Sequence, residues 1–310
     1  MDSCMEGFAH THIPDTHRLG YSRHESDPAG IFPRLGDTTE VHSRSVIESN
    51  NVIPVTIFTL GRFSLLTNGQ PADFGRKVPK RPLELLKAII AQGGREISIS
   101  RLTSLLWPDV DGDQATRSFD TTLHRLRKIL SQERALVLRD GKLSLDSRYC
   151  WVDVWAFERL LGEARRLLRN TADSKQAGLL EGLTENLLAL YQNHFLIREE
   201  VTGWSVSMRE RLRHKFIHHL MEVGRFWETR GCWEQAIECY RKGIDVDDLV
   251  EVFYQRLMNC YLNTGRLSEG MLIYRRCRET LSIVLSLQPE QETELLYQAL
   301  RDARVGRQSA

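Results

Sequence analysis

The sequence predicts a mainly α-helical protein with a small β component, in which the strands are confined to the first half of the chain. Between residues 55 and 71, short apolar runs flank an Asn-Gly pair, which is typical of strands joined by a tight turn. From Asp153 onwards, apolar residues recur at i, i+3 and i+4, the spacing of helices with one buried face. Within this second part, a pattern of aromatic and small residues recurs after 34 residues, which indicates stacked helical hairpins.

The strands fall into three segments. The first, VTIFTLGRFSLLTNGQP, predicts a hairpin or short meander with its turn at Asn68-Gly69. The second is a short extended piece, REISI, and the third is ALVLRDGKLSLD, which predicts two strands around Asp140-Gly141.

Two predicted helices lie between these strands. Pro82 suits the first turn of the first helix, which Gly93-Gly94 ends. Ser100 is the expected cap of the second helix, and Pro108 ends it.

A third helix, over about 113–131 with Asp113 as its expected cap, is apolar on one side and basic on the other. Its apolar stripe recurs at i, i+4, i+7 and i+11 and consists of Phe119, Leu123, Leu126 and Leu130. The opposite face is expected to carry Arg117, Thr121, Thr122, His124, Arg125 and Lys128.

The 34-residue repeat predicts tetratricopeptide-like hairpins in the second half. In each copy an aromatic residue closes one helix, a Gly turns the chain, a small residue lets the next helix pack closely and a Tyr follows. The first copy is Trp227, Gly231, Ala236 and Tyr240, and the second is Tyr261, Gly265, Gly270 and Tyr274. Earlier helices do not keep this register, so we expect them to pack irregularly.

The composition and the net charge limit the classes of protein to which the chain can belong. The chain of 310 residues is 41% hydrophobic and 27% charged, with a formal net charge of +1, so any basic surface must be local. No apolar run approaches the roughly 18 residues that a membrane helix needs, and the N-terminus lacks a signal-peptide pattern. We therefore expect a cytoplasmic protein without membrane contact.

Residues 1–50 are rich in polar residues, and their apolar residues show no sustained helical or strand spacing, which predicts a disordered arm. Its histidines, among them His10 and His12, lack an ordered frame that would make them a metal site. Six scattered cysteines form no Cys-x-x-Cys pair and are interpreted as small core residues. The sequence predicts neither a metal nor a cofactor.

Two helices followed by a β-hairpin form the plan of a winged helix-turn-helix, in which the second helix enters the DNA major groove. The basic face of helix 113–131 would then meet base edges, and Lys128 would meet phosphate. Arg139 and Lys142 flank the turn of the wing, hairpin 135–146, where contact with the DNA backbone or the minor groove is expected. Between residues 76 and 142, fourteen Lys and Arg stand against eight Asp and Glu. A basic helix face can also be merely solvated, so this face indicates DNA binding only together with the neighbouring helix and hairpin.

The sequence is also similar to a known family. Its first half resembles the winged-helix domain of OmpR/PhoB-type regulators, as found in antibiotic-regulatory-protein (SARP) activators, on VTIFTLGRFSL, LLWPD and ATRSFDTTLHRLRKIL. Its second half resembles the bacterial transcriptional activator domain, on WVDVWAFERLL, LLALYQNHFL, WSVSMRERLRHKF and YQRLMNCYLNTGRLSEGMLIYRRCRETL. Asn193 stands where the family prefers Gly. In related regulators the positions of Arg117, Thr121, Thr122 and Arg125 meet bases or flanking phosphates, and the resemblance implies the same here.

The expected organisation is an arm over 1–50, a winged helix-turn-helix over 51–150, a helical-repeat activator domain over 151–302 and a tail over 303–310. The expected function is sequence-specific binding of double-stranded DNA, and the resemblance implies activation together with RNA polymerase. A homodimer on repeated half-sites, and an unknown ligand or protein on the helical-repeat surface, are left open.

Two other classes of protein are weaker interpretations. A protein-interaction scaffold would use the repeats, and its winged helix would contact protein without salt-dependent retention of DNA. An enzyme is not expected, because no nucleophile, base and orienting group can be recognised, and the phosphate loop of an ATPase module is absent from the sequence.

Overall fold

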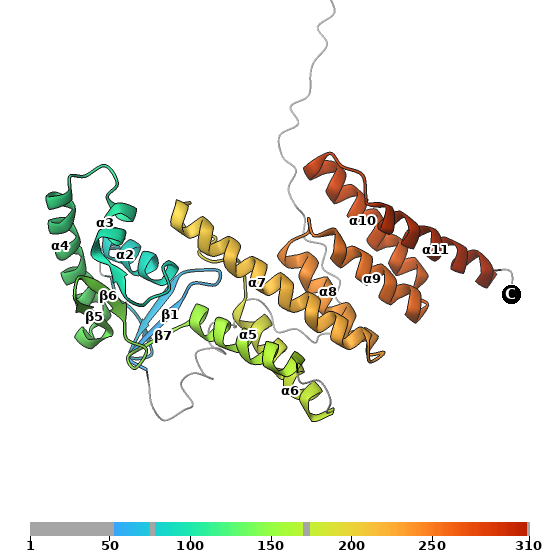
Figure 1. Cartoon of the computed structure of the whole chain (residues 1–310), viewed down its shortest axis with the longest axis horizontal. Helices are drawn as coiled ribbons and strands as arrows, with labels where there is room; N and C mark the ends of the chain where they lie inside the picture. The colour runs from blue at the N-terminus through green and yellow to red at the C-terminus, as the bar shows by residue number, and fades with distance from the viewer. Residues whose placement is uncertain (1–52, 75–77, 170–173, 309–310) are drawn as a thin grey trace, which may run out of the picture. The chain divides into compact units, whose positions relative to one another are not determined.

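The computed structural model describes residues 53–74, 78–169 and 174–308 (Figure 1). The predicted arm and its histidines lie outside the described residues. Residues 49–310 form one compact unit. None of the described helices is long and apolar enough to cross a membrane.

The first sheet contains the predicted meander and one additional strand. It has the order β3-β2-β1-β7, with β1 Val55–Phe58, β2 Ser64–Thr67, β3 Gln70–Pro71 and β7 Cys150–Val152. Asn68 and Gly69 both have positive φ angles, as a primed hairpin turn requires, which confirms the predicted turn. β7 pairs in parallel with β1 and returns the chain to this sheet before the helical half begins.

A second sheet and three helices form the winged helix. The sheet has the order β4-β6-β5, with β4 Ile97–Ser98, β5 Leu136–Arg139 and β6 Lys142–Leu145. The helices are α2 Lys80–Ala91, α3 Ile99–Leu106 and α4 Gly112–Leu130, and a short 3-10 helix, Glu133–Ala135, precedes the hairpin. Asp140 and Gly141 again have positive φ, so β5 and β6 form the predicted wing.

Two predicted helix caps are wrong by two residues each. The cap of α3 is Ser98, whose hydroxyl accepts from the Arg101 amide, whereas Ser100 lies inside the helix. The cap of α4 is Asp111, and Asp113 belongs to the first turn. In both cases the residue nearer the preceding loop has the extended ψ that a cap needs. Asp113, in the first turn of α4, still interacts favourably with the helix dipole.

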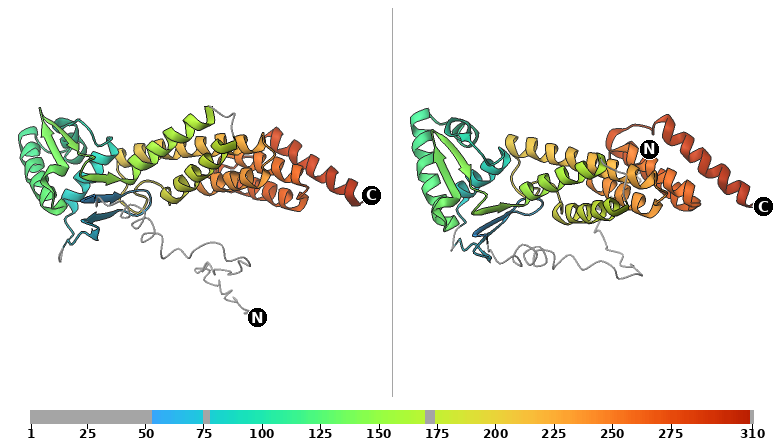
Figure 2. Two further views of the ribbon diagram at one scale, coloured as in Figure 1. Left: turned by 90° about the horizontal axis from the view of Figure 1, so that it is seen from below. Right: turned by 60° about the horizontal axis from the view of Figure 1, so that its bottom comes forward.

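In the described part of the second half there are seven helices, whose bounds are α5 Asp153–Arg169, α6 Ser174–Leu190, α7 Gly203–Glu228, α8 Trp233–Val246, α9 Glu251–Thr264, α10 Leu267–Leu285 and α11 Gln291–Gln308. Successive helices from α7 to α11 pack against one another (Figure 2). Gly231 and Gly265 turn the chain with the same φ of 71°, which confirms the repeat register. α11 continues through residues 303–308, where the sequence predicted a tail.

Glycines allow the helices of this half to approach closely. A Cβ atom built on Gly224 of α7 would lie 2.3 Å from the ring of Tyr240 in α8, and one on Gly243 would lie 2.4 Å from Phe253 in α9. At Gly270, the expected close-packing position, the neighbour is Leu300 of α11. These contacts fix the spacing between successive helices.

A hydrogen-bonded joint connects the winged helix to the helical half. Asp153 at the start of α5 is buried, and its carboxylate accepts from the backbone of Thr59 and of Leu60, the latter at 2.6 Å, and from the Thr59 hydroxyl at 2.7 Å. The Leu196 amide donates to the Thr59 carbonyl at 2.8 Å. The side chain of Asn193 accepts from the His194 amide at 2.7 Å.

Two further side chains fix the loop between α6 and α7. Lys87 of α2 donates to Glu199 at 2.5 Å and lies over the ring of Phe63. Arg209 of α7 donates to the carbonyls of Phe195 and Leu196, both at 3.1 Å. The loop between α6 and α7 is therefore bound both to α2 and to α7.

The described cysteines are free. Four of them are buried, and burial raises the pKa of each of these thiols to about 12. They are the core residues that the sequence predicts, and Cys232 is the half-buried exception.

Candidate nucleic-acid interface

The apolar stripe of α4 anchors this helix to the winged-helix core. Phe119, Leu123, Leu126 and Leu130 are all buried, as predicted, and α4 packs against α2 and α3. The helix ends at Ser131, which adopts the left-handed conformation. The orientation of α4, and therefore of its opposite face, is fixed by these contacts.

The opposite side of α4, termed here the open face, is exposed. It consists of Gln114, Arg117, Asp120, Thr121, His124, Arg125 and Lys128. Arg117, Arg125 and Lys128 form no ion pair with any residue that the structure describes, so their charges are available to a ligand. The Thr121 hydroxyl donates to the Arg117 carbonyl at 3.0 Å, which leaves its methyl group and an acceptor lone pair on the surface.

Thr122 does not belong to the open face, so its predicted position is wrong. Its side chain is only 7% exposed, and its hydroxyl donates to the Ser118 carbonyl at 2.7 Å. The reason is helical spacing: Thr122 follows Phe119 by three residues and precedes Leu126 by four, so it lies on the core side.

Asp120 is a member of the open face that the sequence interpretation missed. It lies three residues after Arg117 and four before His124, and this spacing places the three side chains on one face. A carboxylate here repels phosphate but can accept a hydrogen bond from the amino group of cytosine. The open face therefore combines cations with a hydrogen-bond acceptor.

The wing presents the two predicted cations. Arg139 and Lys142 are cross-strand partners on either side of the turn, and both are exposed. The Lys142 ammonium lies 3.9 Å from the carboxylate of Glu96, which precedes β4. Both side chains are more than half exposed, so water screens this pair and Lys142 can exchange Glu96 for phosphate.

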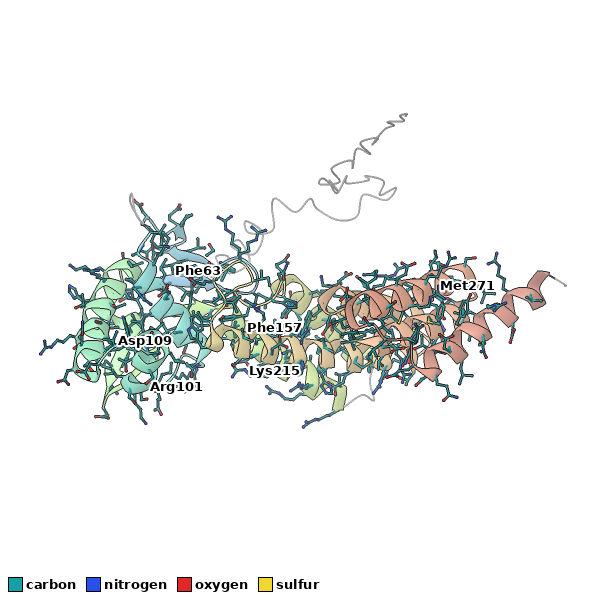
Figure 3. All side chains as sticks on the ribbon, turned by 90° about the horizontal axis from the view of Figure 1, so that it is seen from above. Phe63, Arg101, Asp109, Phe157, Lys215 and Met271 are labelled. Carbon is teal, nitrogen blue, oxygen red and sulfur yellow. The ribbon has the colours of Figure 1, made fainter. Side chains whose placement is uncertain are left out.

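Other charged residues surround α4. Arg101 on α3 is exposed and donates to Gln92 at 3.3 Å, and Asp109 lies in the turn between α3 and α4 (Figure 3). Asp111 and Asp113 are also exposed beside this turn. The acidic residues disfavour an anion at the start of α4, so the cations of its later turns and of the wing are better placed to meet one.

Comparisons with known proteins agree with this architecture. The model of the bacterial transcriptional activator domain family matches residues 152–301. Regulatory protein AfsR of Streptomyces griseus is 26% identical over 218 residues, which cover 70% of this chain and 22% of that protein. The chain thus spans about a fifth of the length of this curated relative.

A solved structure is also similar. EmbR of Mycobacterium tuberculosis, in complex with a low affinity phosphopeptide, matches with a TM-score of 0.60 and 17% identity, over 82% of this chain and 69% of that one. At this identity the likeness concerns the fold alone. Residues 152–301 thus match the bacterial transcriptional activator domain, and the chain, with a winged helix ahead of that domain, is similar to SARP-type transcriptional activators.

Proposed function

We propose that this protein binds double-stranded DNA in a sequence-specific manner, with α4 in the major groove and the wing on the adjacent backbone. The observation that carries the proposal is the open face of α4. Its cations are exposed and unpaired within the described structure, while the opposite side of the helix is buried in the core. A recognition helix needs this combination of a fixed orientation and a free polar face.

The side chains divide into two groups by position. Arg117, Thr121 and Arg125 occupy the open face, where Arg pairs with guanine and a Thr methyl or hydroxyl suits a thymine or mixed edge. His124 lies among them and supplies a further donor or acceptor. Lys128, Arg139 and Lys142 hold the phosphate backbone, because they lie late on α4 or at the turn of the wing.

We further propose that the protein activates transcription, with RNA polymerase as a partner. The support is the match of residues 152–301 to the activator domain family. The helices α7 to α11 form a stack of the kind that offers an extended protein-binding surface.

Selection of bound duplexes from a random pool tests the proposal. We expect a recurring motif from the full chain, and two half-sites in it would indicate a homodimer on DNA. A matched control is the full chain with Arg117→Ala and Arg125→Ala, which should recover no motif. A pool that remains random with the unaltered chain would contradict sequence-specific binding, and a scaffold function would then be favoured.

A further inference from the structure

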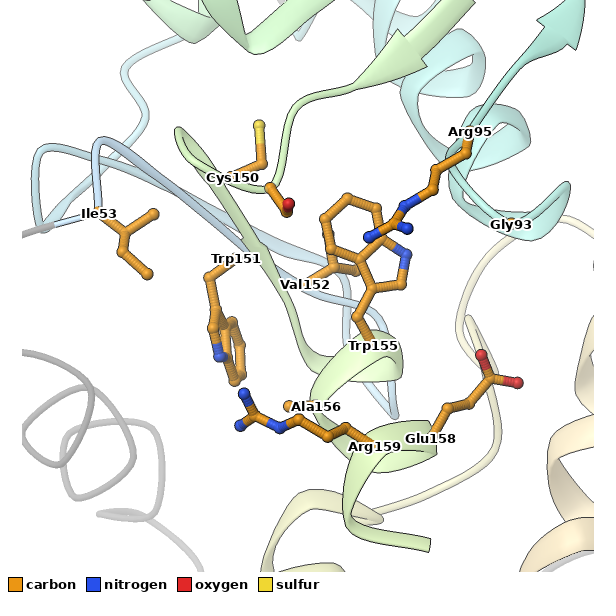
Figure 4. Close-up of a pocket in the computed structure, with 11 residues that line it drawn as sticks. Ile53, Gly93, Arg95, Cys150, Trp151, Val152, Trp155, Ala156, Glu158 and Arg159 are labelled. Carbon is orange, nitrogen blue, oxygen red and sulfur yellow. The ribbon is translucent and has the colours of Figure 1, made fainter. Parts of the chain in front are cut away.

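A cavity of about 480 Å³ lies where the winged helix meets α5 (Figure 4). Gly93 and Arg95 line it from the segment between α2 and β4, Trp151 lines it from β7, and Trp155 and Arg159 line it from α5. Its volume falls in the range of small-molecule sites, which often lie between domains. None of the residues that we assign to DNA contact lines this cavity.

Two tryptophans form fixed aromatic walls. The Trp151 ring packs against Phe58 at 5.3 Å between ring centroids. Trp155 lies directly on the backbone of Gly94, where a Cβ atom would be 2.5 Å from its indole. Both tryptophans are half-buried, so part of each ring remains open to the cavity. Planar aromatic molecules stack on such prearranged surfaces.

The charge of the cavity is positive. Arg95 forms no ion pair with any described residue, and the carboxylate nearest to Arg159 is Glu163, at 4.0 Å. The one carboxylate that lines the cavity, Glu158, is bound by Lys215 of α7. The guanidinium of Arg95 is therefore free to pair with an anion, and Arg159 can exchange its long, solvent-exposed contact with Glu163 for one.

We propose that this cavity binds a planar aromatic anion, such as an aromatic carboxylate or sulfonate. The indoles of Trp151 and Trp155 would stack on its ring system, and the positive charges of Arg95, beside Trp155, and of Arg159, beside Trp151, would attract its negative charge. Arg95 comes from the winged helix and Arg159 from the helical half, and in Figure 4 the Arg95 guanidinium lies beside Trp155 and the Arg159 guanidinium below Trp151. A ligand here would contact both domains.

Two fluorescent probes of similar shape and different charge test the proposal on the full chain. The anionic probe is anilinonaphthalenesulfonate, and the neutral probe is phenylnaphthylamine. We expect saturable binding of one anionic probe per chain, weakened about tenfold by Arg95→Gln and by Arg159→Gln, with little change for the neutral probe. Trp151→Leu should weaken the binding of both probes.

Arg166→Gln is the matched control, because Arg166 is an exposed arginine of α5 that does not line the cavity. Circular dichroism establishes that each variant is folded. Anionic-probe binding that is unchanged in both cavity arginine variants would overturn the proposal, and so would equal weakening by Arg166→Gln. Because the assay contains no DNA, its outcome is independent of the proposed function.

Discussion

At the scale of single residues, Arg117 is the side chain whose loss should best separate base contact from backbone contact. It lies early on the open face of α4 and forms no ion pair with the described residues. We expect Arg117→Ala to cost about 1–3 kcal/mol on the selected duplex and much less on random DNA, measured by gel-shift titration.

Lys142→Ala is the control for this prediction, because Lys142 is a cation of the wing. It should weaken binding to both duplexes about equally and lower the salt slope by about one. Its existing contact with Glu96 is screened, so its loss should scarcely affect stability. The opposite pattern, in which Lys142→Ala changes sequence preference and Arg117→Ala weakens all DNA alike, would exclude the proposed docking.

His219 should make the stability of the protein depend on pH. It is fully buried in α7, and neither ring nitrogen has a partner among the described residues. Burial, with the nearby charge of Arg165, lowers the pKa of His219 from 6.5 to about 4. Because the unfolded chain takes up the proton first, stability is complete above the unfolded pKa and is lost as pH falls towards the folded pKa.

The expected loss in the free energy of unfolding between about pH 7 and about pH 5 is roughly 2 kcal/mol, measured by urea denaturation. His219→Leu should remove this dependence, whereas His214→Gln, an exposed histidine of the same helix, should retain it. If His219→Leu and the unaltered chain lose the same free energy on acidification, another group is responsible.

At the candidate interface, some features could be predicted from the sequence and others could not. The burial of Thr122 follows from its spacing to Phe119 and Leu126 and was predictable from sequence. The proximity of Lys142 to Glu96 was not, because it depends on the pairing of β4 with β6, which joins segments more than 40 residues apart. The spacing of residues along a helix predicts which face each of them occupies. Its neighbours from other elements are determined only by how those elements pack.

At the scale of elements, the hairpin formed by α7 and α8 depends on Trp227. Its side chain is 6% exposed, and its ring packs edge-on against Phe226. We expect Trp227→Ala to lower the free energy of unfolding by about 3–5 kcal/mol in chemical denaturation. Trp204→Ala is the comparison, because Trp204 is only half-buried and should cost clearly less. Equal costs would mean that the ring of Trp227 does not anchor this hairpin.

The repeat itself was predictable because Gly231 and Gly265 must turn the chain at equivalent positions. The close approach at Gly224 was not, because it requires the ring of Tyr240 from the following helix. The same limit applies to β7, whose parallel pairing with β1 joins the two ends of the winged helix. Turn residues and the spacing of apolar residues predict the helices and strands. The contacts between these elements depend on the tertiary packing, which the sequence pattern does not give.

At the scale of the whole molecule, the joint around Asp153 should make the winged helix and the helical half unfold together. Its carboxylate accepts from Thr59, Leu60 and Val154, so Asp153→Asn replaces an acceptor with a donor that faces amide groups. We expect a loss of about 2–4 kcal/mol, seen in one transition for both halves. Asp109→Asn, in the exposed turn between α3 and α4, is the control. Two separate transitions in the unaltered chain would contradict a rigid joint.

The proposed function depends on sequence-specific DNA binding through the open face of α4. Its most direct test is the affinity of the full chain for its selected duplex and for random duplex as salt is raised. We expect both affinities to fall with salt, because Lys128, Arg139 and Lys142 release counterions, with the selected duplex bound at least about 10³-fold more tightly throughout. Equal affinity for the two duplexes at every salt concentration, or no dependence on salt, would contradict it.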